Sequence, residues 1–302
     1  MNSGILLVDK PQGMTSHDVV ARVRRLAGTR KVGHAGTLDP MATGLLLIGV
    51  ESSTRLLHHL VGLDKEYLAT VRLGWGTTTD DAEGEPIDPA APADAVAAVS
   101  REQVLERMSQ LTGVIEQVPS AVSAVKVDGK RAYQRVREGE AVELAARTVT
   151  VSAFDLLDVR PGDGWLDLDV RVACSSGTYV RALARDLGAA LGVGGHLTAL
   201  RRTRIGRFDV AEAGALEGLD AAAARLAPAD AARRALPAVA IDADAVRDLR
   251  HGKRIDPPAD AADLAAGVPA AAIGPGDVLV AIVERRGPQL KVVTGFPAEE
   301  GA

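Results

Sequence analysis

The chain is poor in the residues that build disulfides and metal sites. It contains one cysteine, Cys174, which excludes an intramolecular disulfide and a zinc site made of several cysteines. Its six histidines lie far apart except for the neighbours His58 and His59, and no HExxH-like spacing occurs. We therefore predict no bound metal ion. The residues that alternate around Cys174 predict a buried free thiol on a strand.

Long apolar runs are missing as well. No stretch of 18 apolar residues is present, and the first residues, MNSGILLVDK, lack the anatomy of a signal peptide. The sequence therefore predicts a cytoplasmic protein that makes no contact with a membrane. A length of 302 residues, 47% of them hydrophobic, allows either one large domain or two domains.

The charges are unevenly distributed along the chain. A formal net charge of −5 argues weakly against a nucleic-acid partner. Within residues 10–35, however, only Asp18 opposes a group of basic residues, which leaves a local excess of five positive charges. These basic residues are Lys10, Arg22, Arg24, Arg25, Arg30 and Lys31. A solvated helix face and a rim that contacts phosphate groups both explain this cluster.

The stretch KVGHAGTLDPMATGLLLIGV, residues 31–50, concentrates the unusual chemistry of the chain. Pro40 fixes its own φ angle and disfavours a helical conformation at Asp39, so this part is predicted to be a loop. The apolar residues 44–50 that follow predict a buried strand. Asp39 is therefore a carboxylate presented from a shaped loop at the end of a core strand. An Asx-type turn without chemical function is the alternative for an isolated Asp-Pro pair.

Apolar periodicity predicts the remaining elements of the first 210 residues. The predicted strands are 4–8, 65–74, 147–159, 165–175 and a strand within 192–208; the predicted helices are 16–26 with Ser16 as its cap and Gly28 closing it, 53–61, 101–111 and one that follows Thr178. Tyr67 is expected to point inward, with a partner for its hydroxyl. Arg181 falls in the first turn of a helix, where the helix dipole disfavours a cation, so we expect it to pair with an anion.

Other segments are predicted from composition. The acidic loop 77–84 lacks the twelve-residue EF-hand pattern, so we discount calcium. The Ala/Pro-rich residues 89–99 are predicted to be a surface connection. Residues 211–235 are Ala-rich and predicted to be helical. Short Val/Ile-rich runs separated by Gly and Pro predict a small, mostly β module over 236–302, with a loop at 259–272.

Residues 118–138 form a basic segment for which the sequence allows two interpretations. An extended stretch with a turn at Asp128-Gly129 is predicted first, then a helix that contains a tyrosine, over 132–138. Its basic residues include Lys126, Lys130 and three arginines. They fit an arm that lies against an RNA backbone, and they fit a solvated surface equally well.

Several separated motifs together resemble one family. They are GILLVDKPQGMTSHD, KVGHAGTLDPMATGLL, DKEYLATVRLG, PSAVSAVKVDGKRAY, CSSGTYVRALARDLG and GGHLTALRRTRIG. In this order, over nearly all of residues 4–210, they resemble the bacterial tRNA pseudouridine-55 synthases, the TruB family. The resemblance implies an α+β protein with the pseudouridine-synthase fold, a mixed, largely antiparallel sheet with flanking helices. It implies a catalytic domain over 1–235, with an RNA-binding arm at about 120–150, and a PUA-like RNA-binding domain over 236–302.

The resemblance also implies roles for individual residues. Asp39 matches the nucleophilic aspartate, Tyr67 the tyrosine that packs on the target base, and Arg181 the arginine that pairs with the aspartate. The residues implied to line the pocket or to contact RNA are His34, Tyr179, Leu200, Lys10, Lys126, Lys130 and Arg202. Lys10 also belongs to a motif whose role is structural. The acidic loop aligns through Asp81, but Thr78 replaces an acidic residue, so residues 79–85 receive no role.

The implied activity is conversion of uridine 55 in the T-loop of tRNA to pseudouridine, with base flipping, as a monomer without cofactor, metal or obligatory protein partner. The residues do not decide whether the aspartate attacks the sugar, attacks the pyrimidine or removes a 2′ proton. A tRNA-folding chaperone that acts without catalysis is the alternative from another class. A synthase that depends on a guide RNA and partner proteins is less favoured, because this chain keeps its own basic segment.

Overall fold

The computed structural model describes residues 3–87, 89–120, 126–127, 130–131, 144–261 and 263–298, with the backbone alone at 126–127, 130–131, 260. The chain forms two compact units. The terminal unit consists of residues 1–40, 44–63 and 206–302, and the central unit of residues 41–43 and 64–205. These limits differ from the division at residues 235 and 236 that the sequence favoured, which stays a prediction.

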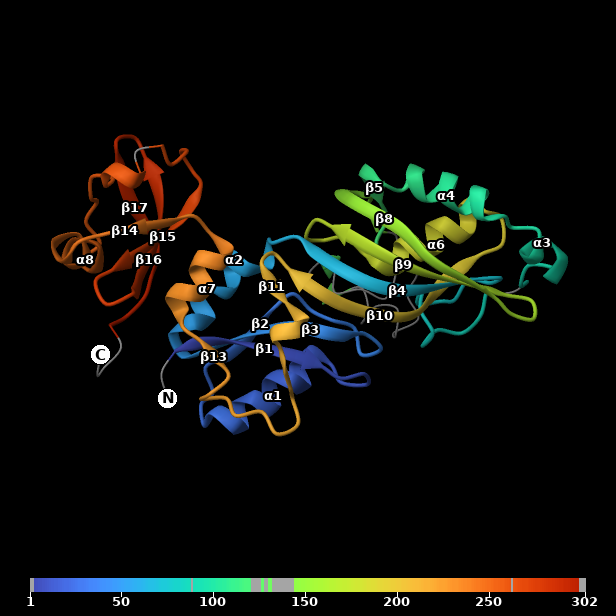
Figure 1. The fold of residues 1–302 in the computed structure, drawn as a ribbon, viewed down its shortest axis with the longest axis horizontal. Helices are drawn as coiled ribbons and strands as arrows, with labels where there is room; N and C mark the ends of the chain where they lie inside the picture. The colour runs from blue at the N-terminus through green and yellow to red at the C-terminus, as the bar shows by residue number, and fades with distance from the viewer. Residues whose placement is uncertain are drawn as a thin grey trace. The chain divides into compact units, whose positions relative to one another are not determined.

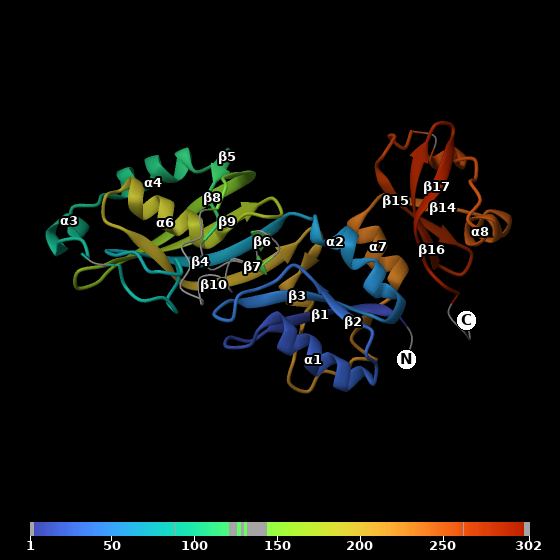
Figure 2. The same cartoon turned by 180° about the vertical axis from the view of Figure 1, so that it is seen from behind.

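The central unit is built on an antiparallel sheet. Its strands, in spatial order, are β10 (Gly195–Ile205), β4 (Lys65–Leu73), β9 (Leu166–Cys174), β8 (Arg147–Pro161) and β5 (Gly113–Gln117). Side chains of β4 alternate between buried and more exposed because successive residues point to opposite faces of the sheet. The helices are α3 (Ala93–Ala97), α4 (Arg101–Gln110) and α6 (Val180–Ala190). Helices α4 and α6 lie together over the sheet (Figures 1 and 2).

The amino-terminal part of the terminal unit consists of paired strands covered by one helix. Its strands are β1 (Gly4–Lys10), β2 (Val32–Ala35), β3 (Thr43–Val50), β12 (Gly214–Ala215) and β13 (Arg225–Leu226). Helix α1 (Ser16–Ala27) packs its valines on β1, β2 and β3 in one core. The cap of α1 is Thr15, not Ser16 as predicted: its hydroxyl accepts from Asp18 N–H, and Asp18 bonds back to Thr15 N–H. Gly28 closes the helix at a φ of 63°, as predicted.

The carboxy-terminal part of the terminal unit has a separate four-stranded sheet. Its strands are β14 (Ala238–Ala240), β15 (Pro269–Gly274), β16 (Val278–Arg286) and β17 (Gln289–Gly295), in that order. Helix α8 (Ala243–Arg250) packs on β16 and β17. The predicted β-rich module is therefore present, although α8 was missed and residues 269–272 belong to a strand instead of a loop. We call residues 236–298 the carboxy-terminal module.

Three regions fold differently from the prediction. The predicted helix 53–61 consists of a 3-10 helix, Glu51–Arg55, and α2 (Leu57–Val61). The Ala-rich stretch 211–235 contains α7 (Pro228–Ala235) and the end of a 3-10 helix, Val210–Glu212. Other residues of the stretch add the short strands β12 and β13 to β1. The connection 89–99 contains α3.

Within the basic segment, β6 (Lys126–Val127) pairs with β7 (Lys130–Arg131) in antiparallel fashion. The predicted turn at 128–129, the predicted helix 132–138 and the side chains of Lys126 and Lys130 lie outside the described residues. Among the helices of the described ranges, none is long and apolar enough to cross a membrane.

Candidate active site

The loop that carries Asp39 is fixed by backbone contacts on both sides of the aspartate. On one side, the hydroxyl of Ser16 accepts from Leu38 N–H at 2.9 Å and donates to Leu38 C=O at 3.1 Å. On the other side, Gly13 N–H donates to Pro40 C=O at 2.8 Å. Ser16 and Leu38 are buried, whereas Asp39 between these two anchors is half-buried. The motif at residues 10–16 therefore holds the carboxylate of the second motif in place.

Lys10 is part of the same brace. Its side chain is fully buried, and Nζ donates to the carbonyls of Met14 at 2.7 Å, Pro11 at 3.1 Å and Pro40 at 3.3 Å. A lysine whose ammonium is enclosed in this way lies away from solvent and is satisfied by fixed backbone acceptors. The burial of Lys10 favours the structural role that was also predicted from its motif, and its contact with RNA stays a prediction.

His34 and the basic face of α1 lie in the same unit. His34 is half-buried on β2, and its ring meets the ring of His17 edge-on, with centroids 5.4 Å apart. Within the basic cluster, Arg24 donates to Val32 C=O at 3.1 Å and Lys31 pairs with Glu51 at 3.5 Å. The cluster therefore divides into residues that stabilise the fold and exposed arginines of α1. The exposed pair Arg22 and Arg25 lines a pocket of about 440 Å³ together with Pro11, Met14, Asp18, Ala21, Leu216 and Glu217.

In the central unit, Tyr67 lies on the buried face of the sheet. It is 9% exposed, as its predicted inward direction requires. In the register of β4 and β10, Tyr67 faces Arg202 and the next position on that face, Ala69, faces Leu200. Cross-strand partners share a face, so Leu200 is a diagonal neighbour of Tyr67. The structure thus brings Tyr67, Leu200 and Arg202 to one face.

Arg202 is buried, with 1% of its surface exposed. Its predicted contact with RNA stays a prediction. Lys65 lies close to Arg202, and burial together with the charge of this arginine lowers the pKa of Lys65 to about 8. Cys174 pairs with Lys65 in the register of β4 and β9 and is buried as predicted. Burial raises the pKa of this thiol to about 11.

Arg181 has the anionic partner that its position in the first turn of α6 predicted. Its Nη1 lies 3.3 Å from Oδ2 of Asp81 and donates to Thr79 C=O at 2.8 Å. Both charged side chains are buried, with 6% and 4% exposed. The second oxygen of Asp81 accepts from Glu83 N–H and from the hydroxyl of Thr79. The acidic loop, to which the sequence gave no role, therefore holds Arg181.

Tyr179, the residue before α6, is fixed through its backbone. The side-chain amide of Gln117 donates to Tyr179 C=O at 3.1 Å and accepts from Tyr179 N–H at 2.8 Å. Gln117 is 2% exposed, while Tyr179 is half-buried. Gln117 was not singled out from the sequence, because a lone glutamine gives no signal there. It closes the amino-terminal end of α6, which has no side-chain cap.

The side chains described above are suited to acid–base and nucleophilic chemistry. Each unit carries buried or half-buried polar residues, but within the described ranges no group of three or more His, Cys, Asp or Glu side chains has the arrangement to hold a metal ion. The terminal unit supplies a carboxylate on a braced loop. The central unit supplies an ion-paired arginine and a buried tyrosine beside an apolar residue. Groups of this kind perform nucleophilic or acid–base chemistry on an organic substrate.

The chain has the pseudouridine-synthase fold. Over 98% of its length it is similar to the solved structure described as "Structure of H/ACA RNP bound to a substrate RNA containing 2'-deoxyuridine", with a TM-score of 0.71, 26% identity and 86% of that chain covered. The predicted α+β class, with a mixed sheet and flanking helices, is confirmed.

The family is defined by sequence comparison. The family model described as "TruB family pseudouridylate synthase (N terminal domain)" matches residues 24–180, and the one described as "tRNA pseudouridylate synthase B C-terminal domain" matches residues 181–244. The chain therefore belongs to the TruB family, as the motifs predicted. It is 59% identical over 305 residues to the "tRNA pseudouridine synthase B" of Leifsonia xyli subsp. xyli, with 99% of this chain and 98% of the relative covered. It is 52% identical over 306 residues to the protein of the same name in Arthrobacter sp., with 99% of each covered.

Proposed function

We propose that this chain converts uridine 55 in the T-loop of tRNA to pseudouridine. The relatives named tRNA pseudouridine synthase B support tRNA as the substrate. The single observation that carries the proposal is the loop of Asp39, which Ser16 and Gly13 anchor on both sides so that a half-buried carboxylate is presented. A carboxylate placed in this way is ready to act as nucleophile or base without first being ordered.

The reaction changes the atom of the uracil base that is bonded to the sugar. The bond from C1′ to N1 breaks, a bond from C1′ to C5 forms, the C5 proton leaves and N1 gains a proton, so the product is an isomer of uridine. The uridine must first leave the stack of the folded loop, which costs roughly a few kcal/mol. In this proposal His34 occupies the space that the base vacates. Asp39 then starts the reaction at the sugar or at the pyrimidine.

Two residues of the central unit act on the same uridine in this proposal. Arg181 stabilises the charge of Asp39 and aims it, and its own rigid pairing with Asp81 keeps the guanidinium in one position. Tyr67 packs against the detached uracil, with Leu200 as the apolar neighbour on its face. The tyrosine hydroxyl then assists removal of the C5 proton. Tyr179 contacts the RNA from the end of α6.

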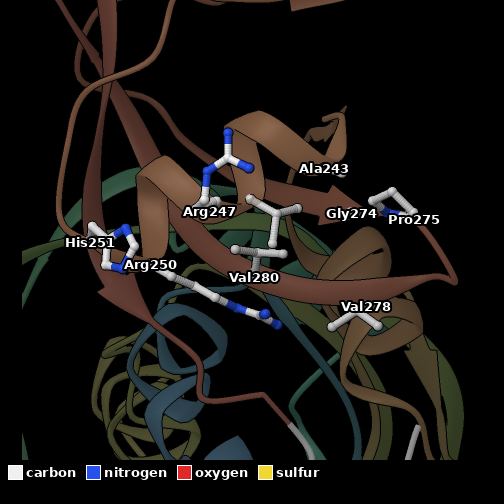
Figure 3. A pocket seen from close by; sticks show the side chains of 9 residues that line it. Ala243, Arg247, Arg250, His251, Gly274, Pro275, Val278 and Val280 are labelled. Carbon is white, nitrogen blue, oxygen red and sulfur yellow. The ribbon is translucent and has the colours of Figure 1, made fainter.

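We also propose that the carboxy-terminal module contributes to tRNA binding. A pocket of about 480 Å³ lies between α8 and the sheet of this module (Figure 3). Arg247, Arg250 and His251 come from the end of α8, and Val278 and Val280 provide an apolar wall. Cationic groups around an apolar wall suit the phosphate and base of a nucleotide. Arg250→Gln should weaken tRNA binding about two- to fivefold and reduce the salt dependence of binding, which a filter-binding titration at several salt concentrations measures.

The chain is proposed to act as a cytoplasmic monomer, without an obligatory protein partner. Activity of the purified chain on unmodified tRNA transcript, with the mass of a monomer in solution, is the expected result. A requirement for a second protein or a guide RNA would contradict this part of the proposal.

The decisive experiment measures tritium released from unmodified tRNA that carries [5-³H]uridine. Pseudouridine formation expels the C5 hydrogen, so release reports the isomerisation itself. Wild type should release tritium and Asp39→Asn should not, while tRNA binding stays within about tenfold because the substitution is nearly isosteric. Replacing Asp94, an exposed carboxylate on α3, by Asn is the matched control and should leave release unchanged.

Each other outcome changes the proposal. Equal release by wild type and Asp39→Asn would remove Asp39 from the mechanism. Tight tRNA binding with no release by wild type would favour the tRNA-folding chaperone, which family membership does not favour.

A further inference from the structure

Two arginines one turn apart on α6 hold two consecutive aspartates of the acidic loop. Arg181 lies against Asp81, and Arg185, four residues later, donates through Nη1 to Oδ2 of Asp80 at 3.1 Å. Residues at i and i+4 of a helix point in the same direction, so the two guanidinium groups face the same loop. Arg181 contacts this loop from a buried position, whereas the side chain of Arg185 is 30% exposed.

The loop adopts an unfavourable backbone conformation at the residue that Arg185 contacts. Asp80 has a φ of 60°, which is rare for a residue with a side chain. Its carbonyl accepts from Leu197 N–H at 3.0 Å, and its carboxylate is 11% exposed. Such a conformation persists where the surroundings hold it. The contacts that hold Asp80 include Thr77 C=O, which accepts from Asp80 N–H at 3.2 Å, strand β10 and the side chain of Arg185.

Arg185 also reaches the end of β5. Its Nη2 donates to Val118 C=O at 2.8 Å, and its Nε donates to Asp186 at 2.9 Å. The preceding residue, Gln117, is bonded to the backbone of Tyr179 at the start of α6. The guanidinium of Arg185 therefore connects the acidic loop and the end of β5 to α6, the helix that carries Arg181.

We propose that Arg185 is a positioning residue that sets the place of Arg181. It does so by holding Asp80 in its left-handed conformation, which keeps the adjacent Asp81 and Thr79 in contact with Arg181. The inference rests on the proposed function, because the rate of pseudouridine formation is the quantity that reports a change at Arg181. It assigns Arg185 no contact with the substrate.

The experiment uses the full-length chain and single-turnover tritium release with enzyme in excess over tRNA. The variants are Arg185→Gln, the isosteric Asp80→Asn, and both together. Each single variant should lower the rate about tenfold while the Kd for tRNA stays within about twofold, because binding does not depend on the position of Arg181. The double variant should be about as slow as the slower single variant, because both changes break one connection.

A chemical rescue separates positioning from general stability. Guanidinium ion at millimolar concentration should restore part of the rate to Arg185→Ala, since it replaces the missing group between Asp80 and Val118. The control is Arg234→Gln. Arg234 has a similar exposure, 32%, and also pairs with a carboxylate, Glu212, but lies in the terminal unit. Its rate should stay at the wild-type value, with or without guanidinium.

The outcomes distinguish this inference from the proposed function. No release by wild type would refute the function before Arg185 is tested. With an active wild type, the inference is wrong if the folded Asp80→Asn and Arg185→Gln variants keep the wild-type rate. It is also wrong if their rate constants multiply in the double variant, or if Kd rises as much as the rate falls. If Arg185→Gln does not fold, Asp80→Asn alone decides, because its shape is unchanged.

Discussion

Replacing Ser16 by Ala tests whether the first motif holds Asp39 in place. The hydroxyl of Ser16 makes two hydrogen bonds to the peptide groups of Leu38, and both residues are buried. The variant therefore leaves one N–H and one C=O without their partner. An unsatisfied buried group costs roughly 1–3 kcal/mol, so the total cost for the two groups is about 2–6 kcal/mol.

This cost can appear in two measurable quantities. If the loop moves so that water reaches Leu38, Asp39 moves with it, and each 1.4 kcal/mol or so lost from the productive position slows the reaction about tenfold. If the loop stays in place, the cost lowers the free energy of unfolding instead. We expect a single-turnover rate 10- to 100-fold below wild type, together with a smaller fall in Tm. Tritium release and thermal unfolding measure the two quantities.

The neighbouring residue provides a matched control. Thr15 also carries a hydroxyl, but this hydroxyl caps α1 through its hydrogen bonds with Asp18. Thr15→Ala should cost about 1 kcal/mol of stability, as lost caps do, and leave the rate near wild type. The reasoning fails if Ser16→Ala keeps both the rate and the Tm of wild type, or if the two variants lose rate to the same extent.

Two further predictions concern the buried groups Lys65 and Cys174. Since the pKa of Lys65 falls from 10.5 to about 8 on folding, the unfolded chain binds more protons above pH 8, and the free energy of unfolding should rise between pH 8 and 9. Lys65→Met should remove this rise, of at most about 1.4 kcal/mol, in urea unfolding; an equal rise in the variant would contradict the assignment. The pKa of Cys174, raised from 9.0 to about 11, acts in the opposite direction, mostly above pH 9, so it offsets only a small part of the rise between pH 8 and 9. The native thiol should react with a thiol reagent at pH 8 far more slowly than the unfolded thiol, and rapid labelling of folded protein would disprove its burial.

Local sequence patterns were sufficient to predict many of the strands. Strands β1, β3, β4 and β9 follow their predicted limits closely, since each is a continuous or alternating apolar run. The helix cap was misplaced by one residue although its signal was present, because Thr15 and Asp18 form the capping-box spacing and Ser16 does not. The Ala-rich stretch after residue 210 was misassigned since helix propensity gave way to pairing with β1, a partner about 200 residues earlier in the chain.

Only part of the candidate site could be predicted, because its contacts join residues that are far apart in the sequence. The charge of Arg181 in a first helical turn correctly predicted an anionic partner, but not which one. Asp81 lies 100 residues before it in the sequence, and only folding brings the two together. Lys10 and Arg202 are residues that the resemblance placed among the pocket or RNA contacts, and the structure buries both. Burial of a charge depends on distant acceptors, such as Pro40 C=O for Lys10, that no local pattern reveals.

The brace around Asp39 limits how the chain can be shortened. The family model that covers the aspartate begins at residue 24. A fragment trimmed to that limit would keep Asp39, Tyr67 and Arg181, yet it would lose Lys10, Gly13 and Ser16, whose donors and acceptor fix both sides of the aspartate. The smallest unit able to present this carboxylate therefore includes residues 10–16, which lie before the limit of the family model.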